Sequence, residues 1–233
     1  MPQEYIIPFI IVITLFVIFY AINMASIFFD KEKLRRITKP FPFLGAVIFL
    51  MIIHIDKPLM YLPFIFGIIG DILLLDRSKK LFLYIGAVSF LINHLLLSFL
   101  IHVEFNFINP YFIIFGIVGS ILLSLVIFNI LFARYNKKHD ISRVESVLGS
   151  IYVSNIIYNI ALSVVLLIIT QNLLLLIFLF GYILFLISDM AIYAKPLNQK
   201  YRIPRQGAIS GTYYIAQIMF FIFTFSNFSL DFD

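Results

Sequence analysis

The sequence of 233 residues contains no cysteine, and only 12% of its residues are charged. The absence of cysteine excludes disulfide bonds, a thiolate nucleophile and a zinc site built on sulfur. A soluble domain would carry about 25% charged residues. With 62% hydrophobic residues and a mean hydropathy of +1.05, the chain has too little polar surface to fold in water. An integral membrane protein is therefore predicted, and a soluble enzyme, a disordered tail and a nucleic-acid-binding domain are excluded.

Long apolar runs dominate the rest of the sequence. An α-helix needs about 20 apolar residues to cross about 30 Å of hydrocarbon, and none of the runs alternates polar and apolar residues as a barrel strand would. The runs lie at 5–29, 40–53, 58–75, 81–101, 110–133, 147–169, 172–194 and 208–226. We therefore expect an all-α polytopic protein, a single domain of eight transmembrane helices over residues 1–233, without a cleaved signal peptide.

The basic residues predict the orientation of this bundle. Of the 17 lysines and arginines, 16 fall after the first, third, fifth and seventh runs, and only Lys57 falls on the opposite side. Basic loops face the cytoplasm, so we expect both termini outside and attribute the net charge of +5 to topology rather than to nucleic acid. Richness in Ile, Phe, Asn and Lys is typical of an AT-rich genome and indicates a bacterial cytoplasmic membrane.

Two acidic residues lie inside predicted spans. An ionisable side chain in hydrocarbon is costly and is therefore a functional candidate. Asp71 precedes Arg77 by six residues and Asp189 precedes Lys195 by six, so both carboxylates are expected about 9 Å inside the cytoplasmic loop charges. Two acids at one depth predict a shared polar pocket on the cytoplasmic side. The alternative is that each acid is a structural hydrogen-bonding group or an interfacial residue that reaches water.

Other polar residues are predicted near this pocket. They are Lys39, His94, Asn155, Tyr213, Tyr214 and Gln217. Each alone is more often a helix-packing hydrogen-bonding group, but together they favour a substrate-binding pocket. The four histidines lie on different elements without the spacing of a zinc helix, so no metal site is predicted.

Several motifs resemble those of a known family. They are TKPF at 38–41, GDILLL at 70–75, FLINH at 90–94, GYILFLISDMAI at 181–192 and TYYIAQ at 212–217. In order and spacing they are similar to the motifs of the YhhN/TMEM86 family of membrane lysoplasmalogenases, which have eight helices.

The resemblance implies hydrolysis of the vinyl-ether bond of a lysophospholipid, a lysoplasmalogen, to a fatty aldehyde and a glycerophospho-headgroup. Asp71 and Asp189 match the family's intramembrane aspartates and would supply acid and base. Neighbouring acids in a low dielectric favour one protonated and one ionised group, and no cofactor is implied. By position, Lys39 would neutralise the lipid phosphate, while Asn155, Tyr213, Tyr214 and Gln217 would orient the water or the carboxyl groups.

Two other functions remain open from the sequence. The first is a small proton-coupled transporter or lipid scramblase with the two aspartates as gates, and the second is a non-catalytic membrane partner. A transporter needs a polar path to both faces, whereas LLLLIFLF at 173–180 and similar runs predict an apolar outer half.

Overall fold

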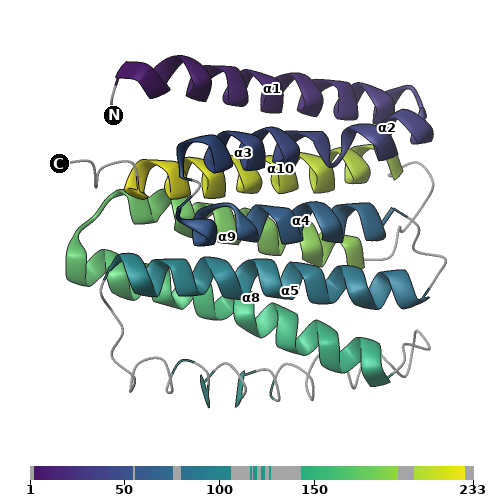
Figure 1. Ribbon diagram of the computed structural model, residues 1–233. Coiled ribbons are helices and arrows are strands. Elements are labelled where there is room, and N and C mark those ends of the chain that lie inside the picture. Colours follow the sequence, from purple (N-terminus) through teal and green to yellow (C-terminus); the bar gives the residue numbers. More distant parts are fainter. Residues whose placement is uncertain are drawn as a thin grey trace.

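In the computed structural model, the chain forms a layered bundle of roughly parallel helices (Figure 1). The structure describes residues 3–54, 56–75, 80–105, 143–193 and 202–228, together with scattered positions between 116 and 126. The described part consists of helices joined by short turns and contains no strand, which confirms the predicted all-α class. The predicted span 110–133 falls almost wholly outside the described residues, so the count of eight helices stays a prediction.

Six helical stretches are long and apolar enough to cross a membrane, among the residues that the structure describes. The helices that form them are α1 (Gln3–Phe28), α2 (Glu32–Thr38) followed by α3 (Phe41–Ile53), α5 (Lys80–Glu104), α8 (Arg143–Thr170), α9 (Leu174–Tyr193) and α10 (Arg202–Phe228). Large apolar side chains such as Ile7, Ile52 and Ile168 are well exposed on their outer faces. This apolar exterior suits a lipid environment.

The predicted third span, 58–75, is shorter than a membrane crossing. A single 3-10 turn, Pro58–Met60, precedes α4 (Leu62–Leu73), which has only 12 residues. At about 1.5 Å per residue such a helix is about 18 Å long. Pro58 and Pro63 each lie in the first turn of a helix, where the missing N–H costs nothing, and they divide the run into two elements. The structure thus shows a shorter apolar stretch, Pro58–Leu73, and a full span here is not confirmed.

The first basic segment is a helix, whereas the sequence predicted a loop. Helix α2 contains Arg35 and Arg36, and Arg36 is paired with Glu32 at 2.6 Å across one turn. Opposite charges four residues apart stabilise a helix. Pro40 separates α2 from α3, and α2 lies beside the end of α1 (Figure 1).

The core that positions the site is aromatic. Helix α10 packs most extensively against α9, and α4 packs against α5. Phe64, Phe185, Phe220 and Phe221 of these helices and Phe43 of α3 are at most 1% exposed. Helix α1 begins and α10 ends at the same end of the bundle (Figure 1), as an even number of spans requires. The side of the membrane on which that end lies stays a prediction.

Candidate functional site

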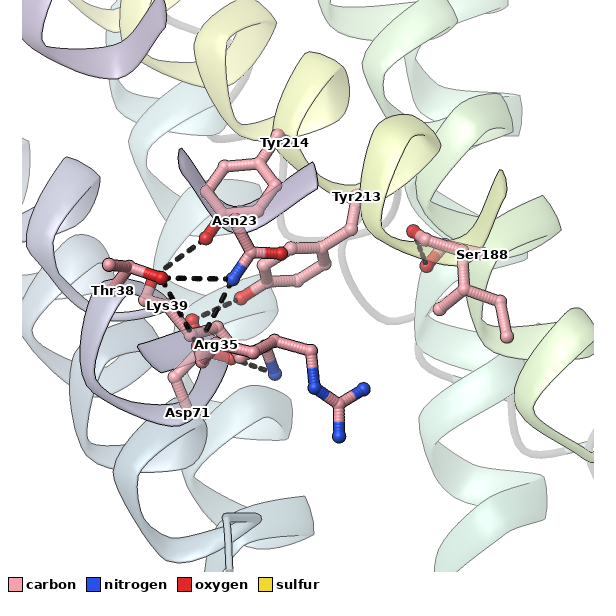
Figure 2. A network of polar contacts seen from close by, with 9 residues as sticks. Asn23, Arg35, Thr38, Lys39, Asp71, Ser188, Tyr213 and Tyr214 are labelled. Atoms are coloured by element: carbon pink, nitrogen blue, oxygen red, sulfur yellow. Dashed lines mark hydrogen bonds and ion pairs between the residues drawn. The ribbon is translucent and has the colours of Figure 1, made fainter. Parts of the chain in front are cut away.

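The side chain of Asp71 lies in the centre of a polar network near the end of α4 (Figure 2). It is fully buried, yet both carboxylate oxygens have partners. The ammonium group of Lys39 lies 2.5 Å from Oδ1, and the hydroxyl of Tyr213 donates a hydrogen bond of 2.7 Å to Oδ2. A buried charge is tolerated when it is paired and hydrogen-bonded, so this network accounts for a carboxylate inside an apolar bundle.

Three elements hold Lys39 against Asp71. Asn23 of α1 donates through Nδ2 to the carbonyl of Arg35 at 3.1 Å and to the hydroxyl of Thr38 at 3.3 Å, which fixes α2 to α1. The hydroxyl of Tyr214 lies 3.4 Å from the carbonyl of Lys39. The Lys39 ammonium group is 5.1 Å from the centre of the Tyr213 ring, within the range of a cation–π contact. Its position is therefore determined by α1, α2 and α10 together.

Asp189 of α9 has a separate environment. It is half-buried, and Tyr152 of α8 donates a hydrogen bond of 2.6 Å to its Oδ2. The neighbouring Ser188 donates a hydrogen bond of 3.0 Å to the carbonyl of Ile209 on α10 (Figure 2). The two aspartates thus share one feature, a hydrogen bond from a tyrosine on another helix.

Helix α10 relates the depths of the two aspartates. Ile209 is adjacent to Ser188, and Tyr213, four residues further along, contacts Asp71. Four residues correspond to about 6 Å along a helix. The contacts of the two aspartate regions with α10 are therefore about one turn apart, and a common depth of the two acids stays a prediction. A shared pocket between them stays a prediction.

The other predicted site residues are distributed over two regions. Lys39 and Tyr213 contact Asp71, and Tyr214 contacts Lys39. His94 is fully buried with its edge against Phe185 at 4.5 Å, and its Nδ1 lies 3.4 Å from the Tyr182 hydroxyl. Asn155 bonds Asn159 within α8, and Gln217 is 1% exposed one turn beyond Tyr213.

The pairing of Lys39 with Asp71 changes the predicted role of Lys39. The sequence predicted a contact with the lipid phosphate, but the ammonium group faces a carboxylate of the protein. Sequence reasoning also missed Tyr152 as the partner of Asp189. The position of Tyr152 in the sequence did not indicate a contact with Asp189, because only the packing of α8 on α9 brings these two residues together.

A shallow depression lies at the same end of the bundle, between α1, α2 and the start of α10. Its lining consists of Ser26, Ile27, Asp30, Glu32, Arg35 and Gln206. None of the predicted site residues lines it. Within the described part of the chain, no group of three His, Asp or Glu side chains is arranged to hold a metal ion.

The fold and these contacts define a polytopic helical membrane protein with two aspartates, each bonded to a tyrosine, in its interior. The sequence matches the YhhN family over residues 34–223, and the chain belongs to that family, the family of the TMEM86 lysoplasmalogenases. The match extends from α2 into α10 and so includes Lys39, Asp71, Asp189 and Tyr213. Comparison with curated proteins and with solved structures gave no match.

Proposed function

We propose that this protein hydrolyses the vinyl-ether bond of lysoplasmalogens by acid–base catalysis with Asp71 and Asp189. Membership of the YhhN family, which is associated with hydrolase activity, supports this class of reaction. The observations that carry the proposal are the two short tyrosine–aspartate hydrogen bonds between helices, Tyr213 to Asp71 and Tyr152 to Asp189, and the ion pair of Lys39 with Asp71.

The ion pair of Lys39 with Asp71 assigns the two roles. An ion pair with Lys39 requires Asp71 to be the carboxylate, and the Tyr213 hydroxyl adds a second donor to it. Asp189 then carries the proton. It protonates the β-carbon of the vinyl ether, which gives an oxocarbenium ion close to the negative charge of Asp71. Opposite charges close together in a low dielectric interact strongly, so Asp71 stabilises the charge that develops in this step.

Water completes the reaction. Its oxygen bonds to the oxocarbenium carbon while one of its protons passes to Asp71, and a hemiacetal forms. The hemiacetal hydroxyl then returns a proton to Asp189, and the departing ether oxygen takes the proton from Asp71. Aldehyde and glycerophospho-headgroup leave, and both aspartates regain their starting states. The reaction requires no cofactor.

The depth of the site favours a lipid with a single chain. The vinyl ether lies a few atoms from the headgroup, so the headgroup can stay at the interface while this bond reaches Asp71. The deeper core is aromatic, with Phe64, Phe90 and Phe178 at most 5% exposed. One alkenyl chain against these rings gains up to about 0.8 kcal/mol per buried CH₂. A second chain adds bulk and replaces the free glycerol hydroxyl, so we expect intact plasmalogens to be poor substrates.

A proton-coupled transporter is the second candidate, because buried polar contacts continue along α5 and α8. The hydroxyl of Ser98 donates to Asn159 at 2.7 Å, and His102 lies 2.7 Å from the Tyr158 hydroxyl. Such contacts also hold membrane helices together. Transport can be measured only across a closed membrane that separates two compartments. Hydrolysis can be measured in detergent micelles, so an assay in micelles distinguishes the two functions.

The test is aldehyde release from a lysoplasmalogen by the purified protein in detergent micelles. We expect Asp71→Asn and Asp189→Asn each to lower kcat by about 10²–10⁴-fold, the usual contribution of an acid or base. Asp56→Asn, an exposed loop position, is the matched control. No aldehyde from the parent protein, or either variant within a few-fold of it, contradicts the proposal. A saturated ether lipid must stay intact, since it cannot be protonated at carbon.

A further inference from the structure

Two buried amide side chains, Gln217 of α10 and Asn93 of α5, contain polar atoms without a hydrogen-bond partner among the described residues. The side-chain amide of Gln217 is 1% exposed, and neither its nitrogen nor its oxygen has a partner among the described residues. Asn93 of α5 is also 1% exposed, and its Oδ1 has no partner in the same part of the chain, while its Nδ2 donates to the Pro63 carbonyl. Buried polar groups are nearly always hydrogen-bonded, so three such atoms call for a ligand.

The helix register places these atoms in one layer. Tyr213 of α10 contacts Asp71 of α4, and Phe221, eight residues further on, contacts Phe64, seven residues back, with ring centres 6.4 Å apart. The two helices are therefore antiparallel, and Gln217 lies opposite Gly67.

Asn93 occupies the same level. A Cβ atom built on Gly67 would lie 3.2 Å from the Asn93 Nδ2 atom. Gln217, Gly67 and Asn93 thus form a layer one turn, about 6 Å, deeper than Asp71.

We propose that Gln217 and Asn93 bind a water molecule beneath Asp71 and that this water is the nucleophile. A buried water needs two to four polar partners. The Gln217 Nε2 donates to the water oxygen, and the Asn93 Oδ1 accepts one of its hydrogens. The second hydrogen is directed to the carboxylate of Asp71, the ionised acid that Lys39 and Tyr213 contact.

The role as nucleophile rests on the proposed function. As the water oxygen bonds to the oxocarbenium carbon, its O–H bond breaks and that proton passes to Asp71. The other hydrogen stays on the new hemiacetal hydroxyl. The amides hold the oxygen and set its direction without exchanging protons. Their loss should therefore lower kcat and weaken the preference for this nucleophile.

A competing nucleophile tests the role. With methanol in the assay, capture of the oxocarbenium ion by water gives aldehyde, whereas capture by methanol gives a stable methyl acetal of the lysolipid. We expect Gln217→Met to lower kcat for aldehyde about tenfold or more and to raise the acetal-to-aldehyde ratio. Thr224→Val is the matched control, because Thr224 is on α10, fully buried and also without a partner among the described residues, but lies two turns further from Asp71. An unchanged rate and product ratio in Gln217→Met would overturn the nucleophile role.

A second measurement needs neither turnover nor a variant. An experimental structure of the parent protein at a resolution that shows ordered water should contain a water within hydrogen-bond distance of Gln217 and Asn93. If the parent releases no aldehyde but this water is present, the proposed function fails and the binding site stands. If the layer is dry or the two amides bond each other, the water site is wrong, whatever the enzyme assay gives.

Discussion

The Tyr213 hydroxyl donates a hydrogen bond of 2.7 Å to Asp71 Oδ2, although 142 positions separate the two residues in the chain. A hydrogen bond to a charged group contributes about 1.5–3 kcal/mol. Tyr213→Phe removes only the donor, so we expect kcat for aldehyde release to fall about ten- to hundredfold. Tyr158→Phe is the control, since the Tyr158 hydroxyl is also hydrogen-bonded but contacts His102 instead of Asp71. Equal losses in both variants would contradict a specific role of Tyr213.

The ion pair between Lys39 and Asp71 predicts coupled stabilities. Lys39→Met leaves a buried carboxylate without its cation, which costs about 3–5 kcal/mol in the free energy of unfolding. Asp71→Asn in the same chain removes the stranded charge, so the double variant should be clearly more stable than Lys39→Met alone. Thermal unfolding of the three variants and the parent in one detergent gives the coupling energy. If the losses of stability in the two single variants add up to the loss in the double variant, the two side chains are not energetically coupled.

The hydrogen bond from Tyr152 to Asp189 should affect catalysis rather than folding. If Asp189 is the acid, Tyr152→Phe removes the group that orients it, and kcat should fall while KM changes little. Tyr158→Phe is the matched control, because Tyr158 is also on α8 and also hydrogen-bonded, but to His102. A change in the pH profile of kcat in Tyr152→Phe alone would support the assignment. Identical kinetics of the two variants would count against it.

Gly70 precedes Asp71 and lies against an aromatic ring. A Cβ atom at this position would be 2.7 Å from two ring carbons of Phe90, closer than atoms can approach. Gly70→Ala should therefore destabilise the protein by about 1–3 kcal/mol through overpacking. At Gly45 the nearest atom to a new Cβ is 3.9 Å away, so Gly45→Ala should be neutral or stabilising. The melting temperatures of the two variants in detergent check this prediction: that of Gly70→Ala should lie below that of Gly45→Ala.

His54, in the turn after α3, predicts a loss of stability in acid. Burial and the nearby Lys57 lower the pKa of His54 below its ordinary value of 6.5, although Asp56 opposes them. Below pH 6.5 the unfolded chain binds a proton that the folded chain does not, so stability falls as the pH decreases. Replacing the residue, in His54→Gln, should flatten the dependence of the melting temperature on pH between about pH 7 and about pH 5. A slope as steep as that of the parent would assign the effect to other groups.

Local properties of the sequence determined the class of protein. Hydropathy over about 20 residues marks a membrane helix wherever it packs, so the ends of α1, α5, α8, α9 and α10 were predicted to within six residues. Asp71 and Asp189 were recognisable because a charge in an apolar run is costly in any arrangement. The limits of α2 and α4 were less predictable, because a charged helix at the membrane edge and a helix divided by proline leave weak patterns in hydropathy.

Tertiary structure alone decided which groups meet. The pairing of Lys39 with Asp71 and the contact of Tyr152 with Asp189 follow from the register between helices far apart in sequence. Hydropathy contains no information about that register, because lipid-facing and buried positions are equally apolar in a membrane helix. The register is set by the fit of side chains such as Phe90 against Gly70. The charge states and partners of the candidate site depend on this packing, since hydrogen bonds and ion pairs act only over a few ångströms.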